Sequence, residues 1–225
     1  MARRKRGLFG KLWFVIWRAV IAFALILLIF RFVPPPTTAF MLQSDYPVKQ
    51  HWISIDKLAP HVPLAVVASE DQRFPTHYGV DFTAITQALS QYDDGDGLRG
   101  ASTITQQTAK NLFLWPGRSF IRKGLEAGLA ISLETVWGKK RILEVYLNVA
   151  EFGKGIYGVD AASQHYFGKS ARYLTMTQAA QLAVLLPSPR KRDPNHLTVN
   201  LRQRVDWIEK QMNQLGAGYL TPILD

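Results

Sequence analysis

The spacing of hydrophobic residues along this chain is mostly helical. Over residues 119–137, apolar side chains occur nearly all around a helical wheel, which predicts a helix buried at the centre of the fold. Stretches that alternate apolar and polar residues are absent from the sequence, so we expect a mainly α fold. Further helices are expected over residues 63–70, 82–92, 103–114, 140–148 and 178–186, and over the stripe Leu201, Val205, Ile208, Met212 and Leu215 that Gly216 closes.

Polar residues mark the starts of two of these helices. Thr103 with Gln106, and Thr175 with Gln178, match the capping box, in which both side chains bind free N–H groups of the first helical turn. Pro63 suits the first position of the helix that ends near Glu70. The starts of three helices can therefore be located from the sequence.

One apolar run is long enough to cross a membrane. Residues 12–33 would span roughly 33 Å as a helix, close to the thickness of the hydrocarbon core. Arg18 and Arg31 lie near its ends and can extend their charges toward water, while Trp13 and Trp17 suit the interface. A cleaved signal peptide is the alternative, but no convincing cleavage site follows the run. We expect an uncleaved anchor.

The positive charge belongs mainly to the N-terminus. The net charge is +10, but seven basic residues and no acidic ones precede residue 34, so the remainder has 20 basic against 17 acidic residues, or +3. This distribution argues against a nucleic-acid-binding protein. The cluster from Arg3 to Arg6 predicts a cytoplasmic N-terminus, which places the rest of the chain on the outer face of the membrane.

A dense polar stretch follows the predicted helix 63–70. Glu70 would lie at the C-terminal end of this helix, where the carbonyl dipoles raise the proton affinity of a carboxylate, as a general base requires. The alternative is that Glu70 and Asp71 form a solvated helix end paired with Arg73.

Two further polar clusters lie on predicted helices. Thr103, Gln107 and Lys110 share one helix face that could bind a diphosphate or a sugar, although the spacing alone also fits a solvent-exposed face. Arg122 and Glu126 could simply pair as i and i+4, or point with Lys123 into a cleft that would then hold a second carboxylate.

Several other chemistries find little support in the sequence. Cysteine is absent, the five histidines form no metal-binding pair, and no nucleophile-elbow sequence is present. The acidic loop 93–100 resembles a calcium loop only superficially, because no glutamate occupies the bidentate position. Two glutamates on separate helices instead suggest sugar chemistry at an anomeric carbon.

Five motifs in order resemble the peptidoglycan glycosyltransferase family (glycosyltransferase family 51), the transglycosylase modules of class A penicillin-binding proteins. They are ED-x-x-F-x-x-H-x-G-x-D from Glu70 to Asp81, G-x-STI-x-QQ-x-x-KN from Gly100 to Asn111, RK-x-x-E from Arg122 to Glu126, ILE-x-YLN from Ile142 to Asn148, and G-x-x-G-x-x-x-A-x-x-x-YFG from Gly155 to Gly168. The resemblance covers roughly residues 58–215, which leaves no length for a transpeptidase domain, so we expect a stand-alone member.

The resemblance implies a lysozyme-like α domain with a smaller membrane-facing lobe, preceded by one transmembrane helix. The expected organisation is a cytoplasmic basic tail (1–11), a transmembrane anchor (12–33), a stalk and membrane-proximal segment (34–57) and the glycosyltransferase domain (58–225). The implied reaction joins lipid II units into β-1,4-linked glycan strands by inverting transfer, with release of undecaprenyl diphosphate.

The resemblance also implies roles for individual residues. Glu70 is expected to be the general base, and Glu126 the second essential glutamate, which orients cations or the diphosphate. Asp71, Phe74 and His77 are assigned to the substrate site as the loop that positions Glu70, whereas Tyr146 is expected to be scaffold. The remaining expected substrate-binding residues are Thr103, Gln107, Lys110, Asn111, Arg122 and Lys123.

No cofactor is expected to be required and no metal ligands are assigned, although a divalent cation (Mg²⁺ or Mn²⁺) at the diphosphate is left open. The expected partners are lipid II, the growing glycan, the bacterial inner membrane and cell-wall synthesis proteins, but no nucleic acid. One rival is a lysozyme-like hydrolase that cleaves peptidoglycan. Another is a non-enzymatic anchor that binds anionic lipid or nucleic acid through residues 190–192.

Overall fold

The computed structural model describes residues 8–86, 102–117 and 119–225. It divides into two compact units, Met1–Pro35 and Pro36–Asp225. The basic cluster from Arg3 to Arg6, the calcium-like loop 93–100 and the end of the helix expected over 82–92 lie outside the described residues; residues 82–86 are helical.

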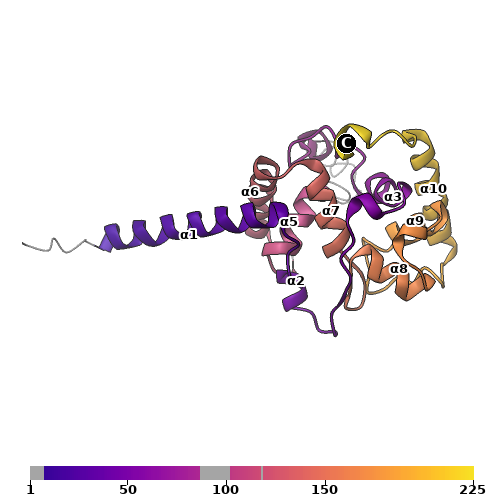
Figure 1. The fold of residues 1–225 in the computed structure, drawn as a ribbon, viewed down its shortest axis with the longest axis horizontal. Coiled ribbons are helices and arrows are strands. Elements are labelled where there is room, and N and C mark those ends of the chain that lie inside the picture. Colours follow the sequence, from indigo (N-terminus) through magenta and orange to yellow (C-terminus); the bar gives the residue numbers. More distant parts are fainter. Residues whose placement is uncertain (1–7, 87–101, 118) are drawn as a thin grey trace, which may run out of the picture. The chain divides into compact units, whose positions relative to one another are not determined.

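The first unit is built around helix α1, Leu8–Phe32, which is the long indigo helix in Figure 1. Residues Phe9–Phe32 are apolar enough and long enough to cross a membrane, by length and composition. The rings of Trp13 and Trp17 meet edge to face at 5.8 Å between centroids, and the Arg18 guanidinium lies 4.2 Å from the centre of the Phe14 ring. The expected anchor therefore forms one uninterrupted helix.

The second unit is mainly α, as predicted. Its described helices are α2 (Ala39–Leu42), α3 (His61–Glu70), α5 (Ile104–Phe113), α6 (Phe120–Val136), α7 (Lys139–Val149), α8 (Val159–Phe167), α9 (Met176–Ala183), α10 (Val199–Leu215) and α11 (Thr221–Leu224), with short 3₁₀ turns at Ile55–Lys57 and Ala171–Tyr173.

The capping signals in the sequence are confirmed. Complete capping boxes join Thr103 to Gln106 at the start of α5 and Thr175 to Gln178 at the start of α9. Gly216 ends α10 with φ of 82°, a conformation that glycine adopts without strain. Helix α3 differs in detail, because it begins at His61 and so places Pro63 third rather than first.

The segment predicted to be a stalk, 34–57, belongs largely to the folded unit. Strand β1 (Lys49–Gln50) pairs in parallel with β3 (Ile156–Tyr157), which pairs antiparallel with β2 (Glu151–Gly153), giving the order β1-β3-β2. The Asn148 side chain also accepts a hydrogen bond from the Ile53 N–H and donates one to the Ile53 carbonyl, both at 2.8 Å. Distant partners, rather than local sequence, therefore order this segment.

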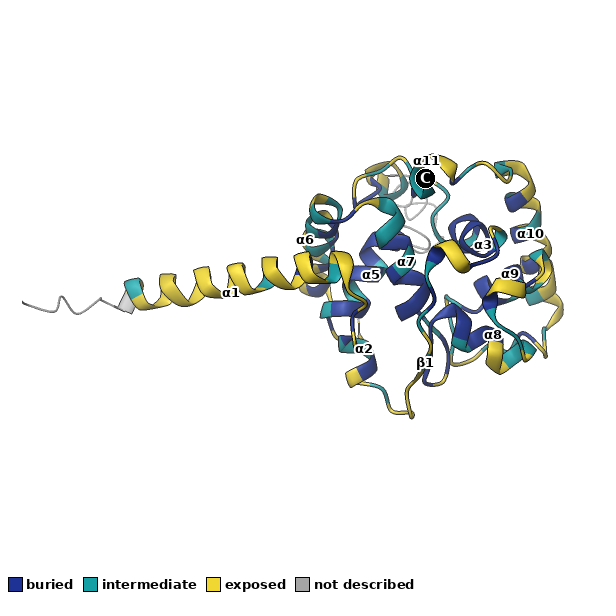
Figure 2. Ribbon diagram, viewed as in Figure 1, coloured by how far each residue is buried: buried dark blue, intermediate teal, exposed yellow. Residues whose placement is uncertain are grey.

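The core is organised by two groups of helices. Helix α5 packs on α6 and α7, and α3 packs on α9 and α10. Figure 2 shows α3, α5 and α7 as largely buried elements inside the second unit. The C-terminal end of α3 faces α5, which brings Glu70 to Gln107. The comparison with lysozyme stays a prediction.

Candidate active site

Glu70 is a partly buried carboxylate at the end of α3. Its Oε2 accepts a hydrogen bond from Gln107 Nε2 at 3.0 Å, and its Oε1 accepts one from Ser69 Oγ at 3.4 Å. Burial raises the pKa of Glu70 above its ordinary value, against the lowering effects of Gln107, Ser69, Arg204 and Lys110. The solvated helix end considered above is therefore not what the structure shows.

Tyr146 orients the Gln107 side chain. The Tyr146 hydroxyl on α7 donates to Gln107 Oε1 at 3.0 Å, so the other end of the same amide, Nε2, points to Glu70. Burial, with the charges of Glu70 and Asp71, raises the pKa of Tyr146 well above its ordinary value, which keeps the hydroxyl protonated and able to donate. The expectation of a scaffold role missed this link, because Gln107 and Tyr146 are 39 positions apart.

Asp71 fixes the loop after Glu70 to the start of α5. Its Oδ2 accepts hydrogen bonds from His77 Nε2 and from the Ile104 N–H, both at 2.9 Å. A carboxylate at this position also suits the positive end of the α5 dipole. Phe74 is fully buried beside His77, with ring centroids 6.1 Å apart. Asp71, Phe74 and His77 therefore lie in the interior of the loop, where they can position Glu70.

A second anchor of this loop was not predicted. Glu134 Oε1 on α6 accepts hydrogen bonds from the Gly79 N–H at 3.1 Å, from Thr105 Oγ1 at 2.8 Å and from Lys139 Nζ at 2.6 Å. Gly79 has φ of 72°, and a Cβ there would lie 3.0 Å from the Ala130 backbone, so the loop requires glycine at this close approach. A Thr103 hydroxyl bond to the Gly79 carbonyl, 2.6 Å, completes the attachment.

Glu126 is a buried carboxylate that binds two cations of α6. Arg122 Nη1 donates to Glu126 Oε2 at 2.9 Å, and Lys123 Nζ binds Glu126 Oε1 and Ser102 Oγ, both at 2.6 Å. Glu126 is 2% exposed and both of its oxygens bind cations, of which Arg122 is buried and Lys123 is partly exposed. The i, i+4 pairing considered above is confirmed. Arg122 Nε is buried and has no hydrogen-bond partner within the described ranges.

Lys110 links the two glutamates electrostatically. It lies on α5 near Gln107, and burial lowers its pKa, while the charges of Glu126 and Glu70 raise it. Its ammonium lies 5.5 Å from the centre of the Phe40 ring. A desolvated ammonium between two carboxylates provides a cation that an anionic ligand could bind.

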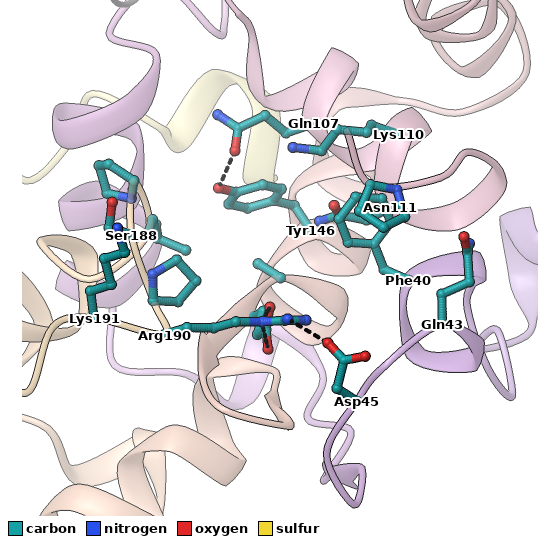
Figure 3. A pocket seen from close by; sticks show the side chains of 16 residues that line it. Phe40, Gln43, Asp45, Gln107, Lys110, Asn111, Tyr146, Ser188, Arg190 and Lys191 are labelled. Atoms are coloured by element: carbon teal, nitrogen blue, oxygen red, sulfur yellow. Dashed lines mark hydrogen bonds and ion pairs between the residues drawn. The ribbon is translucent and has the colours of Figure 1, made fainter. Parts of the chain in front are cut away.

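A cleft of about 500 Å³ lies beside Gln107, Lys110 and Tyr146 (Figure 3). One side is lined by Gln107, Lys110, Asn111 and Tyr146, together with Phe40 of α2 and Gln43 directly after it, and the segment 186–191 lines the other. Glu70 does not line this cleft, but it is hydrogen-bonded to Gln107, which does. Glu70 lines a second hollow of about 290 Å³, together with Asp71, Ser102, Thr103 and Trp207. We name the first cavity the main cleft.

The structure brings most of the expected site residues together, but only some of their side chains face the main cleft. Gln107, Lys110 and Asn111 face the main cleft, whereas the Thr103 hydroxyl is engaged in capping α5 and in the bond to Gly79. The catalytic roles of Glu70 and Glu126, and the substrate-binding roles of the other nine residues assigned from sequence, stay predictions.

Metal ligands are scarce in this region. Across residues 8–86, 102–117 and 119–225, no group of three acidic or histidine side chains could hold a metal ion. Glu126, the nearest carboxylate to the cation cluster, already has both oxygens bound by Arg122 and Lys123. The described side chains around Glu126 therefore leave no unpaired carboxylate oxygen for a divalent ion.

Comparison with known proteins gives a consistent picture. The model of the transglycosylase family matches residues 38–213. A biosynthetic peptidoglycan transglycosylase from Marinomonas sp. (strain MWYL1) is 76% identical over 225 residues, covering 100% of both chains. Proteins of the same name from Shewanella frigidimarina and Haemophilus influenzae are 75% and 47% identical, covering 100% and 94% of this chain and 99% and 92% of their own.

Proposed function

Because the chain belongs to the transglycosylase family, we infer that it is a peptidoglycan glycosyltransferase that polymerises lipid II into β-1,4-linked glycan strands. The relatives that align over their full length are named biosynthetic enzymes, which supports polymerisation over hydrolysis. The observation that supports this chemistry most strongly is a partly buried Glu70 held by Gln107, near the desolvated ammonium of Lys110.

Glu70 acts as the general base in this proposal. It takes the proton from the 4-hydroxyl of the acceptor sugar while that oxygen attacks the anomeric carbon of the donor and inverts it. A raised pKa improves a carboxylate as a proton acceptor, and Gln107 holds the side chain in one position. Tyr146 acts only through Gln107 and is a positioning residue.

The cations serve the leaving group. The donor departs as undecaprenyl diphosphate, a weak base that needs charge stabilisation more than a proton. Lys110 faces the main cleft, and the charges of Arg122 and Lys123 act on it, so positive charge gathers at this side of the cleft. Glu126 holds Arg122 and Lys123 in place rather than acting as an acid, since both of its oxygens are occupied.

We propose no resident cofactor. The residues around Glu126 fit a cation cluster better than a metal site, as described above. A divalent ion that accompanies the diphosphate would belong to the substrate, and no step of the proposed reaction depends on it.

We further propose that α1 anchors the enzyme in the bacterial inner membrane, with the N-terminus cytoplasmic and residues 36–225 on the outer face. The length and composition of α1 support an anchor. The basic N-terminal residues support this orientation through the positive-inside rule. A lipid-linked substrate also makes a membrane location useful, and cell-wall synthesis proteins are the expected partners.

Incubation of the purified full-length protein with lipid II tests the proposed reaction against the hydrolase. We expect long glycan strands and no soluble fragments from finished peptidoglycan sacculi. Fragments released from sacculi, without any polymer from lipid II, would reverse the assignment.

A further inference from the structure

A basic cavity adjoins the main cleft. It has a volume of about 370 Å³ and shares Pro189, Arg190 and Lys191 with the main cleft. Figure 3 shows Arg190 and Lys191 on the segment that borders the main cleft, with the bond from Arg190 to Asp45. A ligand that extends past this segment would therefore enter the second cavity.

The lining of this second cavity is strongly cationic. It contains one acidic residue, Asp193, one histidine, His165, and five lysines and arginines, which are Lys49, Lys154, Arg190, Lys191 and Arg192. Both arginines have partners: Arg190 binds Glu151 and Asp45, and the Arg192 guanidinium donates to the Val184 carbonyl. The other three are lysines, and no acidic side chain pairs with them in the part of the chain that the structure describes, although the Lys154 ammonium lies 5.8 Å from the centre of the Tyr46 ring.

The backbone holds two of these lysines near each other. The Lys49 N–H donates to the Gly155 carbonyl at 2.8 Å, which sets β1 beside the turn that carries Lys154. Gly155 has φ of 72°, and a Cβ there would lie 2.4 Å from the Pro47 carbonyl oxygen, so this close approach requires glycine. We call Lys49, Lys154 and Lys191 the lysine groove.

We propose that the lysine groove binds the carboxylates of the peptide stems of the glycan that occupies the main cleft. This inference rests on the proposed function, because the substrate of that reaction carries a pentapeptide on each disaccharide. Such a peptide ends in a free carboxylate and is flexible. Flexible ammonium groups suit an anion whose position varies, whereas Arg190 is already fixed by two carboxylates.

Continuity between the cavities favours the peptide stem over an anionic lipid headgroup. The glycan must pass through the main cleft to react, and its stems would lie next to residues that both cavities share. The groove would therefore raise affinity for stem-bearing chains without touching the reacting atoms.

The test compares two substrates and two triple variants of the full-length enzyme, first in neutral detergent and then in vesicles containing anionic lipid. One substrate is lipid II, and the other is lipid II whose stem carboxylates are converted to amides. The groove variant carries Lys49→Gln, Lys154→Gln and Lys191→Gln. The matched control carries Lys57→Gln, Lys169→Gln and Lys210→Gln, which change the net charge equally but line neither cavity.

Each exposed ion pair changes an equilibrium constant by about 1.4-fold to 5-fold, so three together predict a KM higher by on the order of tenfold. We expect this rise in the groove variant with lipid II, at nearly unchanged kcat, and in the wild type with the amidated substrate. Combining the groove variant with the amidated substrate should raise KM no further than either change alone. The control variant should behave as the wild type. Added salt should reduce the difference.

Equal KM values of the wild-type enzyme for both substrates would overturn the inference, and this comparison needs no variant to fold. A loss in the groove variant that is the same for both substrates and appears only in vesicles containing anionic lipid would assign the groove to headgroups instead, and so overturn it. Absence of any polymer from the wild type would refute the proposed function itself.

Discussion

At the scale of single residues, the site depends on one amide that connects two ionisable side chains. Gln107 donates to Glu70 and accepts from Tyr146, so the amide has one favoured orientation. Lys110 and Arg204 add positive potential at Glu70. The carboxylate therefore combines a high proton affinity from burial with a fixed direction.

Replacing Gln107 by Leu should move the pH dependence of the reaction. The hydrogen bond from Gln107 lowers the pKa of Glu70, so its loss raises that pKa further. Activity falls as pH drops through the pKa of the base, and the acidic limb of the kcat/KM profile should therefore move to higher pH. Tyr146→Phe should shift it in the same direction by less. An exposed control, Gln203→Leu, should leave the profile in place; an unmoved acidic limb in Gln107→Leu would show that this bond does not tune the base.

Replacing Glu70 by Gln should stabilise the folded protein at neutral pH. Burial raises the pKa of Glu70 in the folded state, so ionisation of Glu70 destabilises that state as pH rises above the ordinary carboxyl range. One pH unit of difference in pKa corresponds to about 1.4 kcal/mol. Thermal unfolding should show a higher Tm for Glu70→Gln near pH 7 and the same Tm as wild type below about pH 4. A lower Tm at neutral pH would argue against the raised pKa.

At the scale of elements, local signals in the sequence located helices well and distant contacts poorly. The capping boxes of α5 and α9 are formed within four residues, so they could be read directly. The sheet could not, because β1 and β3 are only two residues long and pair across about a hundred positions of sequence. Glu134 was missed for the same reason, since its partner Gly79 is 55 positions away.

The capping box of α5 should matter for activity as well as stability, whereas that of α9 should matter for stability alone. Thr103→Ala and Thr175→Ala each remove an N-cap, which costs about 0.5–2 kcal/mol. Because α5 carries Gln107 and Lys110, we expect Thr103→Ala to lower kcat severalfold at a temperature where both variants are folded. Denaturant unfolding and polymerisation rates measure the two effects. Equal kcat values of the two variants would contradict this prediction, because they would show that α5 keeps its position in the site without the Thr103 cap.

At the scale of the whole molecule, we propose separate tasks for the two units. Residues 36–225 contain the candidate site and the lysine groove, and α1, which is long and apolar enough to cross a membrane, is the proposed anchor. The sequence predicted both tasks, the first through its motifs and the second through one apolar run. The boundary between them was placed too late, because residues 36–57 have the composition of a linker but belong to the second unit.

A charge in the middle of α1 should weaken membrane insertion. Ile21 lies near the centre of the candidate span, where an arginine would cost about 2.5–3.5 kcal/mol. Ile21→Arg should increase the share of protein extracted from membranes by alkaline carbonate, while Leu12→Arg, near the end of the span, should not. Equal extraction of both variants would count against α1 as a membrane-spanning anchor.

The most direct test of the central claim is polymerisation of lipid II by the full-length Glu70→Gln variant. The substitution keeps the size and hydrogen-bonding capacity of the side chain but removes the base. We expect glycan strands from the wild type and none above background from the variant, at matched folding and membrane insertion. Polymer formation by Glu70→Gln at a substantial fraction of the wild-type rate would contradict the assignment of Glu70 as the base.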